Sequence, residues 1–79
     1  MSDRSSKKTM VQVMAGGRIY GAETYFGVIG LMGMERLYDN AALAGKQRSV
    51  SVLGRTIMFD SSEGFVRGLS KAGLLKLIE

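Results

Sequence analysis

The chain has to fold without the usual crosslinks, because its 79 residues contain neither cysteine nor histidine. A chain of this length buries only about 60% of the surface that its unfolded form exposes, so its own core leaves a small margin of stability. Small domains commonly widen that margin with disulfides, bound metals or a partner chain. We therefore expect a single domain without metal or cofactor, and we predict a homo-oligomer, in the simplest case a homodimer.

Composition narrows the class of protein further. Hydrophobic residues make up 46% of the chain, which is typical of a globular protein, and glycine contributes 11 residues, about twice its average usage of ~7%. The formal net charge is +4, a moderate excess that favours contact with polyanions without specifying a fold. The absence of cysteine speaks against a secreted module stabilised by disulfides, and we expect a protein of a reducing compartment, the cytoplasm.

The first part of the chain predicts a tail and a hairpin. Residues 1–8 are polar and basic, so we expect a flexible tail in front of one domain spanning 9–79. Residues 9–14 alternate as a strand would, and the glycines that follow suit a turn. Residues 18–20 can then return as a second strand.

The central segment is the hardest to interpret. Residues 22 to about 43 contain no proline and favour a helix that is apolar on all sides. Whether the glycine-rich part is helix or strand stays open, because glycines at every third position fit either. Its ten mostly apolar residues, 25–34, are too few to cross a membrane, which takes ~20.

The second half contains the clearest hairpin, formed by residues 48–52 and 55–59 around Leu53 and Gly54. The acidic and hydroxyl residues 60–63 then predict a helix start. Gly73 predicts that helix's end, with Leu74 folding back on Leu69. The last residues, 74–78, could form a short strand or a docking segment.

These elements predict an α+β fold. We expect the two hairpins to form one small antiparallel sheet, covered on one face by the central and C-terminal helices, with a mostly helical arrangement as the alternative. No internal repeat is evident in the sequence.

The residues offer no pattern typical of catalysis. Without histidine and cysteine, the familiar nucleophile–base pairs and zinc sites are unavailable, and the carboxylates have no metal-loop spacing. Gly45 and Lys46 do not complete a phosphate-binding loop, because Asn40 stands at its first glycine and Gln47 at its hydroxyl position. We therefore expect a protein that is not an enzyme.

The segment Val28-Ile-Gly-Leu-Met-Gly33 resembles the V-I-G-x-x-G segment of KH domains. The resemblance implies a loop between two helices that lies against single-stranded nucleic acid. Its middle residues, Leu31 and Met32, are apolar, however. This favours glycines that permit close packing, and we name Gly27, Gly30 and Gly33 as a candidate oligomer interface.

The candidate binding residues are cations and tyrosines. They are Lys46, Arg48, Arg55, Arg67, Lys71, Tyr20 and Tyr38. The alternative is that the lysines and arginines are ordinary solvated surface residues and that the tyrosines lie at the edge of a small core. Five methionines besides Met1 indicate either an adaptable core or a deformable binding surface.

We accordingly expect a non-enzymatic protein-binding module that inhibits or modulates a larger macromolecule. Phages and mobile elements use such small proteins as host-directed inhibitors, anti-CRISPR proteins among them, and a phage-encoded chain would act in the host cytoplasm. Two alternatives stay open. One is a small basic nucleic-acid-binding protein, and the other is a phage structural or assembly component.

Overall fold

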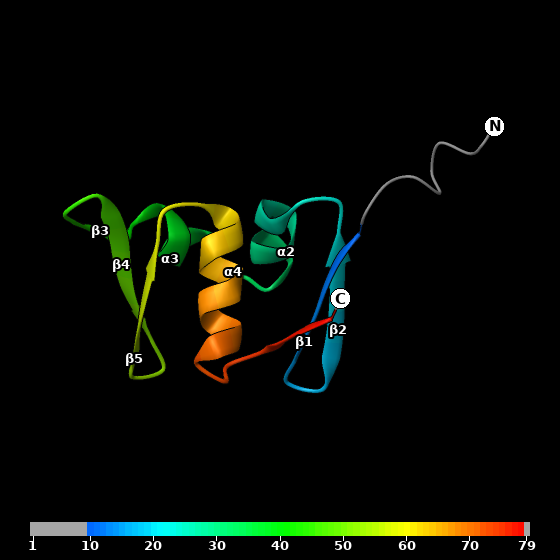
Figure 1. Cartoon of the computed structure of the whole chain (residues 1–79). Helices are drawn as coiled ribbons and strands as arrows, with labels where there is room; N and C mark the ends of the chain where they lie inside the picture. The colour runs from blue at the N-terminus through cyan, green and yellow to red at the C-terminus, as the bar shows by residue number, and fades with distance from the viewer. Residues whose placement is uncertain (1–9, 79) are drawn as a thin grey trace.

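The computed structural model describes residues 10–78 and has the predicted α+β class (Figure 1). The predicted tail lies outside the described residues. In chain order the elements are β1 (Val11–Ala15), β2 (Arg18–Ala22), α2 (Tyr25–Leu31), α3 (Glu35–Asp39), β3 (Ala42–Ala44), β4 (Gln47–Val52), β5 (Arg55–Phe59), α4 (Ser62–Lys71) and β6 (Lys76–Ile78).

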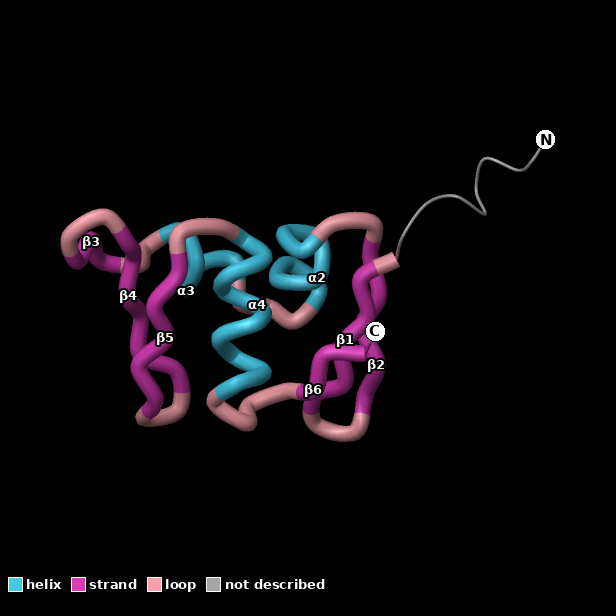
Figure 2. Tube along the Cα trace, in the orientation of Figure 1, coloured by secondary structure: helices cyan, strands magenta, loops and turns pink. Residues whose placement is uncertain are grey.

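The two predicted hairpins exist, but they do not share one sheet. One antiparallel sheet has the order β2-β1-β6 and the other has the order β3-β4-β5. The helices lie between the two sheets, as Figures 1 and 2 show, so the molecule has three layers. The prediction of a single sheet was wrong because each hairpin pairs with a distant short strand and not with the other hairpin.

The central segment is also divided more finely than predicted. It forms two short helices, α2 and α3, followed by strand β3, in place of one long helix. Gly33, with φ of 76°, adopts the left-handed conformation that ends α2. The prediction of one helix failed because apolar periodicity alone does not locate such an ending.

Both hairpins turn through two residues with positive φ. These are Gly16 (60°) and Gly17 (80°) in the first hairpin, and Leu53 (50°) and Gly54 (80°) in the second. Two positive values are typical of the type I′ turn, which matches the twist of the flanking strands. Leu53 is therefore strained where the first hairpin has glycine, and its side chain is 84% exposed.

Relief of this strain gives a first prediction. A side chain other than glycine, asparagine or aspartate in the left-handed region costs about 1–2 kcal/mol. We expect Leu53→Asn to raise the free energy of unfolding in urea by about 1 kcal/mol. Leu53→Ala is the matched control, because it removes the exposed side chain but keeps the Cβ strain. An alanine variant as stable as the asparagine variant would contradict this explanation.

Helices α2 and α4 begin and end in the same way. The hydroxyl oxygens of Thr24 and Ser61 accept hydrogen bonds from the backbone N–H groups of Gly27 and Gly64, at 3.0 and 3.1 Å. At the other end, the N–H of Leu74 donates to the carbonyl of Leu69 at 3.0 Å. With φ of 81° at Gly73, this confirms the predicted ending of α4. The N–H of Met34 bonds to the carbonyl of Ile29 in the same manner, also at 3.0 Å.

The matching turns, helix starts and helix ends show that the chain contains an internal repeat, which was not predicted from the sequence. A shift of 37 positions carries Gly17 to Gly54, Arg18 to Arg55, Thr24 to Ser61 and Gly27 to Gly64. The same shift places β2 on β5 residue for residue and the start of α2 on the start of α4. Few other residues are identical, so the repeat is visible in backbone conformation and capping rather than in sequence.

Each repeated unit completes the sheet of the other unit. The strand that follows α2 and α3 is β3, which pairs with β4 of the second unit. The strand that follows α4 is β6, which pairs with β1 of the first unit. The chain therefore consists of two strand–strand–helix units that exchange their third strands.

The core lies where the layers meet. It contains Val11, Val13, Val28, Ile29, Val52, Ile57, Phe59, Phe65, Val66, Leu69 and Leu75, all buried. Helices α2 and α4 pack against each other as well as against their own hairpins. Each helix thus has one hairpin and the opposite helix as neighbours, and the two units share one core.

Candidate functional site

The outer face of the sheet β2-β1-β6 exposes large apolar side chains. In β1 the valines are buried while Gln12 and Met14 are exposed, so the even-numbered positions point away from the helices. Their registered partners share that side, with Ile19 opposite Met14 and Ile78 opposite Gln12. Met10 precedes the strand and is also exposed. We call Met10, Met14, Ile19 and Ile78 the apolar face.

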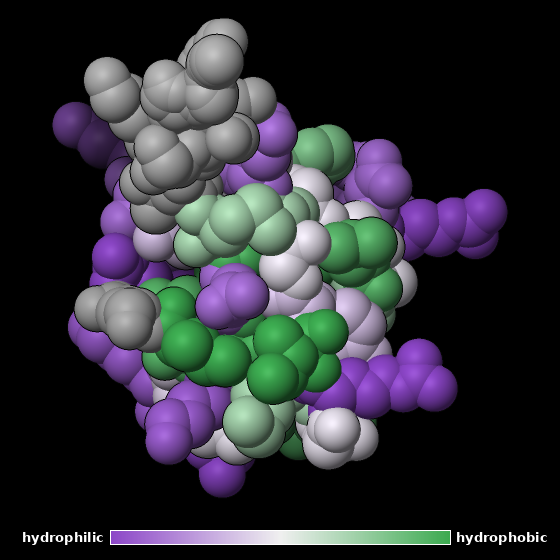
Figure 3. Space-filling view, turned by 90° about the vertical axis from the view of Figure 1, so that its right-hand side faces the viewer, coloured by the Kyte–Doolittle hydropathy of each residue, from purple (hydrophilic) through white to green (hydrophobic). Residues whose placement is uncertain are grey.

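Figure 3 looks onto this side of the molecule and shows hydrophobic side chains gathered across the sheet. Gly21 leaves room among them: the terminal carbon of Met10 lies 3.4 Å from where a Cβ at Gly21 would stand. The charged residues of the three strands are Arg18 and Lys76, and Lys76 is paired with Met14. By register Lys76 shares the outer side with Met14, whereas Arg18 is paired with Ala15 and belongs to the inner side. Among the described strand residues, Lys76 is therefore the cation beside the apolar face.

The equivalent face of the second sheet is different. The 37-residue shift replaces Gln12 by Ser49, Met14 by Ser51 and Ile19 by Thr56. Met58, which is 47% exposed, stands where the first sheet has Gly21. Because both sheets have the same backbone and cover the same kind of core, this fold does not require apolar residues at these outer positions.

A hollow of about 340 Å³ opens beside the apolar face. Val11 and Leu77 contribute to its apolar wall, and Met10 and Ile78 belong to both the hollow and the apolar face. Gln12, Tyr25 and Arg67 supply its polar groups, and the Arg67 guanidinium donates to the Tyr25 hydroxyl at 3.4 Å. Its volume lies within the range of small-molecule and side-chain pockets, roughly 300–1,000 Å³.

The predicted residue Tyr38 lies on α3, within an aromatic cluster. Its ring stacks on Phe59 at 5.2 Å between centroids and meets Phe26 and Phe65 edge-on, both at 5.6 Å. The guanidinium of Arg48 lies 5.7 Å from the ring centroid and donates to the Tyr38 carbonyl at 3.3 Å. These contacts give Tyr38 and Arg48 a structural role.

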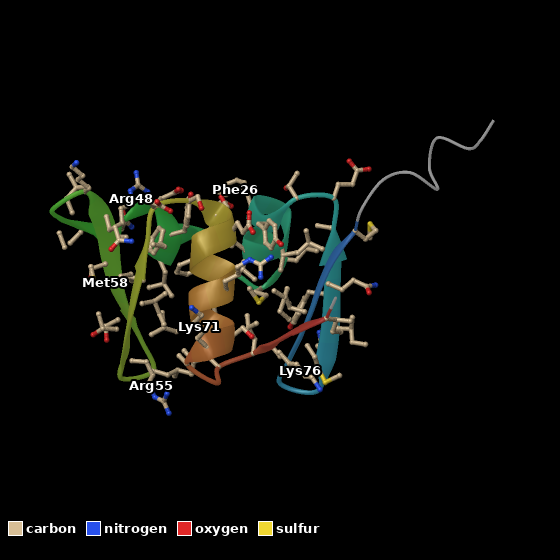
Figure 4. All side chains as sticks on the ribbon, in the orientation of Figure 1. Phe26, Arg48, Arg55, Met58, Lys71 and Lys76 are labelled. Atoms are coloured by element: carbon tan, nitrogen blue, oxygen red, sulfur yellow. The ribbon has the colours of Figure 1, made fainter. Side chains whose placement is uncertain are left out.

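The remaining predicted cations do not gather with Arg48 in one place. Figure 4 shows Arg48 at one end of the molecule, and Arg55 and Lys71 at the opposite end, where the hairpins turn. Arg55 donates to the carbonyl of Ala72 beyond the end of α4. Arg67 pairs with Glu63 at 2.8 Å, and Lys46 lies in the turn before β4.

The remaining predicted residues are Tyr20 and the three glycines of the candidate oligomer interface, and they lie in different surroundings. Tyr20 is half-buried on the inner side of β2, opposite Val13. A Cβ at Gly27 would stand 2.9 Å from that of Ala22, so this glycine permits close packing within the chain. Gly33 ends α2, and a Cβ at Gly30 would lie 4.0 Å from the Oε1 atom of Glu35. The three glycines therefore do not line one continuous helix face.

The comparisons with known proteins add no functional assignment, because no family model, curated protein or solved structure matches the chain. Within residues 10–78, no helix is both long and apolar enough to cross a membrane. The same described residues contain no group of three acidic side chains that could hold a metal ion.

Sequence reasoning missed the apolar face and the hollow. Met10 and Met14 belong to the five methionines counted in the sequence. Met14 is joined to Ile19 by the first hairpin, but Ile78 is added only through the register of β6. The alternation of residues 10–14 is the local signal that points to an outward-facing pair. The hollow has no local signal, since its walls come from four separate elements.

Proposed function

We propose that this chain is a non-enzymatic protein-binding module whose contact surface is the apolar face. The observation that carries the proposal is the contrast between the two equivalent sheets. In one sheet Ser51 and Thr56 occupy two neighbouring outer positions, and in the other sheet the exposed side chains of Met14 and Ile19 occupy the same two positions. Exposed apolar patches bordered by polar residues are typical of protein–protein contact sites.

The positive charge of Lys76 beside the apolar face agrees with this proposal. Lys76 shares the outer side of the sheet with Met14, and the three strands carry no acidic residue, so the fitting partner surface is apolar with a carboxylate near Lys76. A small module of this kind acts by covering a surface of a larger macromolecule and thereby inhibiting or modulating it. Host-directed inhibitors of phages and mobile elements, acting in the cytoplasm, are the class that we favour.

The test exchanges the outer residues of the first sheet for those of the second. We expect Met14→Ser with Ile19→Thr to keep the fold, because Ser51 and Thr56 occupy the equivalent positions. Loss of two apolar contacts of about 1–2 kcal/mol each should weaken partner binding roughly 30-fold or more. The measurement is affinity capture from cells of the source organism, followed by titration of the purified captured partner.

The matched control is Met58→Ser, which removes an exposed methionine from the other sheet and should leave binding unchanged. A partner that binds both variants equally well would contradict the proposal. Recovery of nucleic acid in place of protein, with steep loss at higher salt, would favour the nucleic-acid alternative. Sedimentation of the same variants tests the homo-oligomer: a dimer dispersed by the double substitution would make the partner a second copy.

A further inference from the structure

The hollow beside the apolar face has a counterpart in the other half of the molecule. The 37-residue shift carries two of its lining residues, Val11 and Tyr25, onto Arg48 and Ser62. Arg48 and Ser62 are both direct neighbours of Tyr38: Arg48 lies over the ring, and the Ser62 hydroxyl donates to the Tyr38 hydroxyl at 3.1 Å. In the second half, therefore, the equivalent space holds a tyrosine ring.

The reason is a difference in chain length between the two units. After α2, residues 32–41 lead to β3 and include α3, which carries Tyr38. After α4, only residues 72–75 separate the helix from β6, and no helix is inserted. The first half consequently receives no aromatic ring from the second.

The residues that contact the tyrosine ring also differ between the two halves. Tyr38 contacts Phe59 and Phe65, and the 37-residue shift relates these two rings to the smaller residues Ala22 and Val28 of the first half. The chain therefore fills one of two equivalent spaces with its own tyrosine and leaves the other as a hollow of about 340 Å³.

We propose that the hollow receives a tyrosine side chain of the partner protein. This proposal rests on the proposed function, since Met10 and Ile78 are shared between the hollow and the apolar face. The Tyr25 hydroxyl, which stands where Ser62 stands in the filled space, accepts from Arg67 and retains its own proton to donate to an incoming phenol oxygen. A buried tyrosine is a common anchor of protein interfaces.

The first experiment tests the hollow without any partner. The probe is 4-methylphenol, the tyrosine side chain, added to the full ¹⁵N-labelled chain, with toluene as the probe that lacks the hydroxyl. We expect saturable shifts of the amide signals of Val11, Gln12, Leu77 and Ile78, at millimolar concentration and at least threefold tighter for 4-methylphenol. Absence of saturable shifts at these amides, or equal binding of toluene, would overturn the proposal.

Matched tryptophan variants locate the site. Gln12 is exposed and lines the hollow, so Gln12→Trp should fill it and weaken 4-methylphenol binding more than tenfold. Ser49→Trp, at the equivalent position of the other sheet, should leave the binding unchanged. Amide spectra of both variants without probe show that they remain folded. Equal binding by the two variants would place the probe elsewhere and overturn the proposal.

The second experiment separates a partner tyrosine from a free phenolic ligand. For the captured partner, Gln12→Trp should weaken binding at least tenfold, whereas Ser49→Trp should not, and one tyrosine-to-alanine substitution in the partner should reproduce the loss. If 4-methylphenol binds but Gln12→Trp does not change the affinity for the partner, the tyrosine proposal fails. The apolar face is then still tested separately by the Met14→Ser, Ile19→Thr double variant. If the phenol binds and those variants also show no protein partner, the hollow is a small-molecule site.

Discussion

Replacement of Tyr38 by alanine should lower the free energy of unfolding by about 2–4 kcal/mol, because its ring joins three phenylalanines into one cluster. Total stabilities of small domains are about 5–15 kcal/mol, so this loss is a large share. Urea unfolding followed by far-UV circular dichroism measures it. Tyr38→Phe should cost only about 1 kcal/mol, since it removes the hydrogen bond from Ser62 and keeps the ring.

Leu37 provides the control for this prediction, because it is the neighbour of Tyr38 on α3 and is exposed. Leu37→Ala should change the stability by less than about 0.5 kcal/mol. Added 4-methylphenol should partly restore the Tyr38→Ala variant by occupying the space that the ring leaves. Equal losses of unfolding free energy for Leu37→Ala and Tyr38→Ala would mean that α3 stabilises the protein through helix formation and not through the tyrosine ring.

The sequence predicted the parts of the fold that local chemistry determines. The two-residue turns, the helix start at Ser61 and the ending at Gly73 each follow from residues that are adjacent in the chain. The last strand was predicted as one of two possibilities for the same reason. These features need no knowledge of what packs against them.

The arrangement of the parts was not predictable in this way. The short strands β3 and β6 contain three residues each, too few for a periodic pattern, and each is stabilised by a strand from the other unit. Even the repeat escaped detection, because the units share capping and turn geometry but few identical residues. The expected single sheet followed from pairing the hairpins with each other, the simplest choice when exchange is not considered.

The candidate site, like the fold, could be predicted from the sequence only in part. Tyr38 and Arg48 were chosen as possible binding residues, and the structure shows that the two residues contact each other; their role in binding stays a prediction. The apolar face could be found only after the register of β6 was known, since Ile78 reaches it from the far end of the chain. The contrast with the second sheet, on which the proposed function rests, also needs the repeat.

The exchange of strands predicts how the chain responds to being divided. The turn between β3 and β4 is exposed, with Gly45 at φ of 71°, so a break there removes no buried contact. The break separates the two units, and each loses the strand that the other supplied: the first loses β6 and the second loses β3. Each also loses the opposite helix from its core.

We therefore expect fragments 1–45 and 46–79 to be unfolded when separate and to fold together when mixed in equal amounts. A single hairpin with one helix buries too little apolar surface to compensate for its loss of conformational entropy. Far-UV circular dichroism of each fragment and of the mixture measures this, and the signal of the mixture should depend on concentration, because folding now includes association. An intact chain with Gly45→Ala is the control: it strains the same turn and should lose only about 1–2 kcal/mol. A fragment that folds as a monomer would show that its unit does not need the exchanged strand, and the two-unit description of the core would then be wrong.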